Sequence, residues 1–108
     1  MKSATERADE LLGILNAEIA LQEYAEQFLA PYVCVLDDGE VSIELIFDDF
    51  RIGFSVDPDP VESSWSLVTK AGRLGFVHAY GYLFVLNPQA LIGWLIQFAS
   101  IAGEFRTQ

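Results

Sequence analysis

The chain has a single cysteine, Cys34, among its 108 residues. One thiol excludes an internal disulfide framework and a zinc site built from cysteines of this chain. The N-terminal stretch lacks the apolar segment of a secretory signal. No uninterrupted apolar run reaches the roughly eighteen residues that a membrane-spanning helix needs. These absences lead us to expect a soluble, cytoplasmic protein.

Basic residues are also scarce. Six lysines and arginines stand against sixteen acids, which gives a formal net charge of -10 at pH 7. A charge of this size repels nucleic-acid backbones and anionic membrane surfaces, and no basic stripe accompanies the aromatic residues. We therefore expect neither direct nucleic-acid binding nor membrane binding, and basic proteins become the favoured partners.

Charge is distributed unevenly along the chain. Nine of the acids lie between Asp37 and Glu62, where Arg51 is the only base, whereas Leu74 to Gly103 carries no charged residue. Hydrophobic residues make up 52% of the chain, which is too apolar for a disordered acidic segment. The length suits one core. We predict a single domain over residues 1–108 with acids on a folded surface.

Periodicity and turn signals predict an α+β fold. Ser3 and Glu6 have the spacing of a capping box, and Pro31 cannot continue a helix, which together favour a helix over residues 4–29. Asn87 and Pro88 are typical of a second helix start. Between the helices the period changes to two, with acidic or glycine-containing turns. We expect a two-layer arrangement of an N-terminal helix, an antiparallel meander of four to five strands over residues 32–36, 41–47, 50–56, 64–70 and 74–86, and a C-terminal helix over residues 88–105.

Two features of this pattern predict packing. The strand at 74–86 is apolar on both faces, which favours a central place in the sheet, with Gly81 in a small-residue row that a helix approaches. Trp94 is expected to be structural and is placed on the main apolar face of the last helix. Each helix also has a second apolar patch, and a dimer interface is one interpretation of the four residues Leu12, Leu15, Ile92 and Ile96.

No motif indicates catalysis. The only histidine, His78, lies among aromatic residues, where a packed core histidine is the default, and a pair with Cys34 has no supporting motif. The acids lie mostly in turns, where aspartate is favoured because it bonds its own backbone, and none has the spacing of a calcium loop. We predict no enzyme activity, no cofactor and no metal site.

The preferred hypothesis is a non-enzymatic module that occupies a basic surface of a partner, including a nuclease or another nucleic-acid-binding protein. In size and charge the chain is similar to anti-restriction, anti-CRISPR and toxin-immunity proteins, which is an analogy of class. A purely solubilising role for the acids is the competing interpretation. The residues predicted to bind the partner are Asp37, Asp38, Glu40, Glu44, Asp48, Asp49, Asp57 and Asp59.

A second hypothesis is a dimeric, chaperone-like adaptor. Acidic α+β proteins of the secretion-chaperone type dimerise through helices and hold an extended client on a sheet face. In this chain the dimer would use the second apolar patches of the helices.

Overall fold

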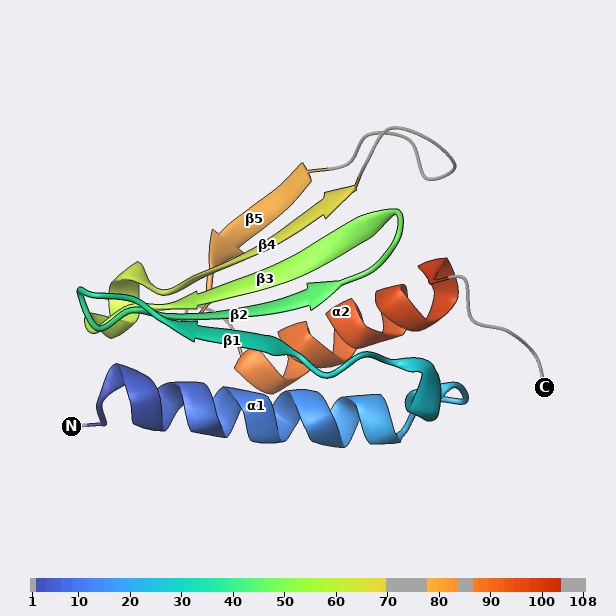
Figure 1. Ribbon diagram of the computed structural model, residues 1–108, viewed down its shortest axis with the longest axis horizontal. Coiled ribbons are helices and arrows are strands. Elements are labelled where there is room, and N and C mark those ends of the chain that lie inside the picture. Colours follow the sequence, from blue (N-terminus) through green and yellow to red (C-terminus); the bar gives the residue numbers. More distant parts are fainter. Residues whose placement is uncertain (1, 70–77, 84–86, 104–108) are drawn as a thin grey trace.

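The structure, a computed structural model, describes residues 2–69, 78–83 and 87–103. These residues form one antiparallel sheet with two helices on one of its faces (Figure 1). The predicted α+β order of helix, meander and helix is confirmed. Along the chain the elements are α1 (Ala4–Ala20), the 3-10 turn η1 (Ala25–Gln27), β1 (Tyr32–Val35), β2 (Val41–Ile46), β3 (Phe50–Val56), the 3-10 turn η2 (Pro60–Glu62), β4 (Ser64–Thr69), β5 (His78–Tyr82) and α2 (Pro88–Ala102).

Short turns set the strand order β1-β2-β3-β4-β5, in which every neighbouring pair is antiparallel. In the first hairpin, the Leu36 amide donates to the Glu40 carbonyl at 2.8 Å, and the Gly39 amide donates to the Leu36 carbonyl at 3.0 Å. Gly39 has φ +88°, a left-handed conformation that glycine adopts without steric cost. The predicted turn at residues 37–39 is therefore confirmed.

One face of the sheet packs against the helices. Alternate residues of β2 and β3 are buried there, as period-two patterning requires. Both helices contribute to the same core, and α1 also packs directly against α2. The buried hydrophobic residues include Ala4, Ala8, Leu11, Leu15, Val41, Ile43, Leu45, Phe50, Ile52, Phe54, Val56, Leu67, Ile92, Leu95, Ile96 and Ala99.

Helix α1 begins as predicted and ends earlier than predicted. The Glu6 amide donates to the Ser3 hydroxyl, and the Glu6 carboxylate accepts from the Ser3 amide, which completes the capping box. The helix stops at Ala20 and not at residue 29. Seventeen helical residues span about 25 Å, close to the roughly 24 Å of the seven-residue strand β3. Continuing the helix would carry the chain past the sheet it must re-enter at β1.

The second apolar patches of the helices lie inside the protomer. Leu15, Ile92 and Ile96 are fully buried, and Leu12 is half-buried against the core. Leu15, Ile92 and Ile96 are therefore core residues and Leu12 packs at the margin of the core, so they do not form a dimer surface, because α1 and α2 lie beneath one sheet and contact each other. Trp94 is 57% exposed. Its predicted structural role is not borne out, since α2 turns the side that carries Ile92 and Ile96 toward the sheet.

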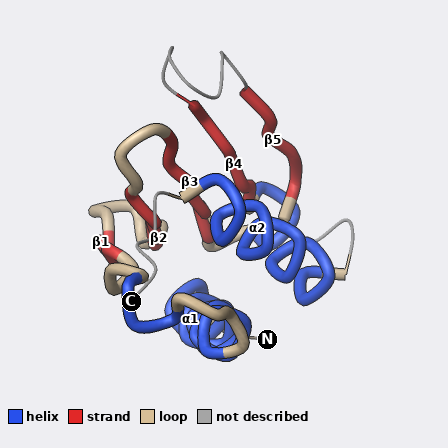
Figure 2. Tube along the Cα trace, turned by 90° about the vertical axis from the view of Figure 1, so that its right-hand side faces the viewer, coloured by secondary structure: helices blue, strands red, loops and turns tan. Residues whose placement is uncertain are grey.

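Strand β5 is an edge strand, so the predicted central position is wrong (Figure 2). Its residues on the face away from the helices, His78, Tyr80 and Tyr82, are exposed, and Gly81 lies on the opposite face. A Cβ added at Gly81 would lie 2.9 Å from Nε1 of Trp65, on the neighbouring strand. The small residue at position 81 thus accommodates an indole and not a helix. The remainder of the predicted strand, residues 74–77 and 84–86, lies outside the described residues.

Two glycine substitutions test this packing with opposite signs. Gly81→Ala should lower the free energy of unfolding by about 1 to 3 kcal/mol, because the rigid indole of Trp65 occupies the space that the new methyl group needs. Gly13→Ala should raise it by about 0.5 to 1 kcal/mol, since position 13 is an open site within α1. Urea denaturation measures both changes. A stabilising Gly81→Ala would contradict the contact with Trp65.

Candidate functional site

The predicted partner-binding acids concentrate at one end of the sheet. In a meander, alternate connections lie at the same end, so the β1–β2 turn and the β3–β4 loop are neighbours beside the start of α1 (Figure 1). We name this region the acidic end. It consists of Asp37, Asp38, Glu40, Asp57, Asp59 and Glu62.

Contacts join the two acidic connections. A Cβ added at Gly39 would lie 3.5 Å from Cγ of Pro58, an ordinary van der Waals distance, so the turn and the loop touch. The Ser55 hydroxyl on β3 donates a hydrogen bond to the Glu40 carboxylate. The acidic end is therefore one surface formed by two connections.

Arg7 attaches the loop to helix α1. Its guanidinium Nη2 donates to the carbonyl oxygens of Asp57 at 2.9 Å and Pro58 at 3.0 Å, and the residue is only 9% exposed. A buried cation thus lies directly beneath the acidic loop. Sequence reasoning missed Arg7, although a signal was present: with Ala4, Ala8 and Leu11 it shares the helical spacing of the buried stripe.

Turn chemistry accounts for three of the six carboxylates. Oδ1 of Asp38 accepts from the Glu40 amide at 2.9 Å, and Oδ1 of Asp57 accepts from the Asp59 amide at 2.9 Å. Oδ1 of Asp59 accepts from the Val61 amide at 3.2 Å, which caps η2. These bonds order the loops.

Two carboxylates of the acidic end have no such local role. Asp37 and Glu62 are exposed, and the carboxylate of neither makes a hydrogen bond or an ion pair with another described residue. Turn chemistry therefore leaves these two acids unexplained, and they are the sharpest probes of a binding role. Glu62 was not among the predicted residues. Its placement beside Asp57 and Asp59 follows from the short turn η2.

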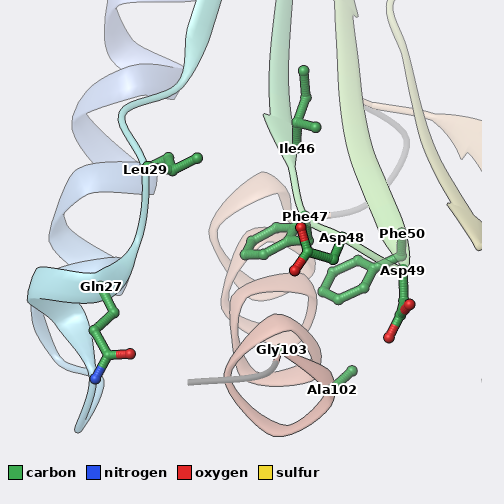
Figure 3. Close-up of a pocket in the computed structure, with 9 residues that line it drawn as sticks. All are labelled: Gln27, Leu29, Ile46, Phe47, Asp48, Asp49, Phe50, Ala102 and Gly103. Atoms are coloured by element: carbon green, nitrogen blue, oxygen red, sulfur yellow. The ribbon is translucent and has the colours of Figure 1, made fainter. Parts of the chain in front are cut away.

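The other predicted acids lie elsewhere. Asp48 and Asp49 form the β2–β3 turn at the opposite end of the sheet, beside the stacked rings of Phe47 and Phe50, whose centroids are 4.3 Å apart (Figure 3). This turn borders a hollow of about 180 Å³. Glu44 lies on β2 between the two ends, on the face away from the helices. The structure thus divides the eight predicted residues among three places.

No element among the described residues covers the face of the sheet away from the helices, which we call the uncovered face (Figure 2). At the centre of this face, small side chains on the three middle strands border a shallow depression of about 150 Å³. Exposed tyrosines lie at both edges of the face. The small residues are Ser42, Gly53, Ser55, Ser64 and Ser66, and the exposed tyrosines are Tyr32 on β1 and Tyr80 and Tyr82 on β5.

The arrangement does not assemble a catalytic pair from His78 and Cys34. His78 is exposed beside Tyr80, with ring centroids 5.4 Å apart, so the core histidine prediction is wrong because its side chain lies on the sheet face away from the helices. Cys34 lies on β1 at the other edge, and four strand spacings, about 19 Å, separate β1 from β5. Among the described residues, no group of three or more histidine, cysteine or acidic side chains is placed to hold a metal ion.

Comparisons with protein families, with curated proteins and with solved structures find no match to this chain. Within residues 2–69, 78–83 and 87–103, neither helix combines the length and apolar character needed to cross a bilayer.

Removing the tether beneath the acidic loop tests its structural role. Arg7→Met keeps the apolar stem and removes the donors, so it should lower the free energy of unfolding by about 1.5 to 3 kcal/mol. Amide exchange at Asp59 and Val61 should also become faster as the loop loosens. Lys2→Met is the control. Lys2 forms an exposed pair with Glu10, so its replacement should change stability by no more than about 0.5 kcal/mol.

Proposed function

We propose that this chain is a non-enzymatic binding protein whose acidic end occupies a basic surface of a partner macromolecule. The observation that carries the proposal is that the β1–β2 turn and the β3–β4 loop, both acidic, form one surface. The buried Arg7 holds the β3–β4 loop in place through two hydrogen bonds. Ordered loops present their charges without the entropy cost of fixing them on binding. Carboxylates held in this way steer a basic partner at long range and select its orientation.

The basic surfaces that best suit such a binder are those that bind nucleic acid. Phosphate contacts on these surfaces come from lysine and arginine side chains, and carboxylates on a rigid end compete for the same donors. The proposed biochemical role is therefore inhibition, in which the chain displaces nucleic acid from a nuclease or another nucleic-acid-binding protein. The net charge of -10 supports this direction of recognition.

Neutralising the two acids without local partners tests the site. Asp37→Asn combined with Glu62→Gln should weaken binding to a partner recovered from host extract on the immobilised protein. We expect a loss of about fivefold at low salt, because two surface charge pairs disappear. The salt dependence of the dissociation constant between about 0.05 and 0.5 M should also become shallower. Isothermal titration calorimetry measures both quantities.

The matched control makes the same change of charge at the other end. Glu23 and Glu26 are exposed in the connection between α1 and β1, so Glu23→Gln with Glu26→Gln also removes two charges. This variant should bind within about twofold of the wild type. Equal losses of affinity in both variants would show that net charge alone matters. Unchanged affinity of the Asp37→Asn, Glu62→Gln variant would exclude the acidic end as the binding site. A short fluorescent DNA duplex that stays on the partner at saturation would argue against inhibition.

A second candidate function uses the uncovered sheet face. The exposed tyrosines at its edges and the low centre between them suit an adaptor that holds an extended client, and they are independent of the helix patches now found in the core. This version of the adaptor hypothesis keeps the client site on the sheet and gives the helices a purely structural role in place of the dimer interface.

Replacing two tyrosines separates this candidate from the first. Tyr80→Ser with Tyr82→Ser should weaken capture of reduced, carboxymethylated ribonuclease A by about tenfold or more, because large aromatic contacts dominate such surfaces. Fluorescence anisotropy of the labelled client measures the effect. Leu21→Ser with Ile101→Ser removes equally exposed apolar side chains away from this face and serves as control. No capture by the wild-type protein would eliminate the adaptor candidate.

A further inference from the structure

Strand β1 is an apolar edge with exposed side chains. It has no charged residue. Tyr32, Val33 and Val35 within β1 are exposed, Val35 by 64%, and so is Leu36 directly after the strand. Soluble proteins usually protect an edge strand with charge, proline or a covering segment, because its unpaired backbone can accept another strand. Within β1 itself none of the four residues provides such protection.

The exposure of the inward side chains follows from the position of the helix. Val33 and Val35 point to the same side of the sheet as Ile43 and Val41, their partners on β2, which are buried. Helix α1 packs against β2 and β3. The two valines therefore reach beyond the helix layer, and a neighbouring strand with its own helix would bury them.

The free backbone groups of β1 can be identified from the first hairpin. Leu36 is hydrogen-bonded to Glu40, and bonding to β2 alternates along an antiparallel strand. Cys34 thus directs its backbone groups toward β2, whereas those of Val33 and Val35 point to the free edge. No described residue outside the strand pairing bonds them.

We propose that β1 pairs with β1 of a second copy of this chain, antiparallel, to form a two-fold dimer with a continuous ten-stranded sheet. In one register, all the free backbone groups of Val33 and Val35 find partners. Val33 then lies opposite Val35 of the copy, and the two residues exchange two hydrogen bonds. A shift of one step toward the N-terminus would set Val35 against Pro31, which has no amide hydrogen to donate.

The distribution of charge along β1 permits a second copy as the occupant. In this register no charged side chain faces another across β1, and Tyr32 lies opposite Leu36 of the copy. Each Asp37 lies opposite Pro31, about 20 Å along the strands from the other Asp37, which is well beyond the screening length of roughly 8 Å. Two copies of a chain with charge -10 thus meet without apposed carboxylates.

Symmetry also favours β1 with itself. Pairing of β1 with the other edge, β5, would be head-to-tail and would continue into an open fibre. Pairing of β1 with β1 closes after two copies. Its axis is perpendicular to the sheet, so both uncovered faces point the same way and all four helices lie on the opposite side.

The position of Cys34 provides a direct test. In the proposed register Cys34 lies on the two-fold axis opposite its copy, in a non-hydrogen-bonded pair whose Cα atoms are about 4.5 Å apart, within the range of a disulfide. Oxidation with copper phenanthroline, which takes the two thiol hydrogens, should convert the protein to a covalent dimer at a rate independent of its concentration. Cys34→Ser with Val61→Cys places an exposed thiol far from the axis and should give little such product.

A second test measures mass without oxidation. Light scattering coupled to size exclusion at about 100 µM should give twice the monomer mass of 12.0 kDa for the wild type. Val35→Lys puts a charge into both of the Val33–Val35 pairs at the centre of the interface and should halve the measured mass. Val61→Lys makes the same substitution at a similarly exposed site, 69% against 64%, and should remain dimeric. Val35→Pro, which removes only a free-edge amide, should also give a monomer.

The outcomes separate the possibilities. A wild-type monomer at this concentration would overturn the proposal and leave the edge to a strand from another protein. A dimer that survives both Val35 substitutions would place the interface elsewhere. A dimer that depends on Val35 but does not crosslink through Cys34 would overturn the register. Failure of the acidic-end experiment affects none of these results, because the variants change different residues.

Discussion

Burial of one sheet face beneath two helices is the constraint from which the rest of the structure follows. The buried residues of β2 and β3 need a cover, and α1 and α2 supply it side by side. Packed helices lie about 8 to 10 Å apart, whereas the five strands span about 19 Å between their outer axes. Two helices therefore cover the middle of the sheet and leave β1 beyond their reach. On the opposite face, which carries polar and small residues, no described helix or strand lies over the sheet.

The same constraint explains where the charge lies. Most acids sit in connections at the ends of the sheet or on exposed helix positions, where water screens them. The buried base, Arg7, lies where the start of α1 passes under the β3–β4 loop and satisfies two carbonyl oxygens there. A loop of prolines and aspartates offers few backbone donors of its own, so an arginine beneath it supplies bonds that the loop cannot make internally.

Local signals were sufficient to predict the elements. The turn at residues 37–39, the strand at 50–56 and the start of each helix follow from short-range chemistry, and all are found. Properties that depend on how one element packs against another were harder to predict. Sheet length decides where α1 ends, and strand order decides that β5 is an edge. The division of the acids between two ends was implicit in the meander, because successive turns alternate, but the prediction that all eight acids bind one partner overlooked this alternation. Arg7 was visible as a base in an apolar stripe.

The two candidate functions would use the proposed dimer differently. Antiparallel pairing of β1 points the two acidic ends in opposite directions, so a single small basic domain cannot reach both, and each protomer would bind its own partner. The uncovered faces instead merge into one surface, with the two Tyr32 side chains near its centre and the β5 tyrosines at its margins. An extended client could cross that surface and contact both protomers, which raises avidity without new contacts. Stoichiometry therefore reflects which surface the protein uses: one partner per protomer for the acidic end, and one client per dimer for the sheet.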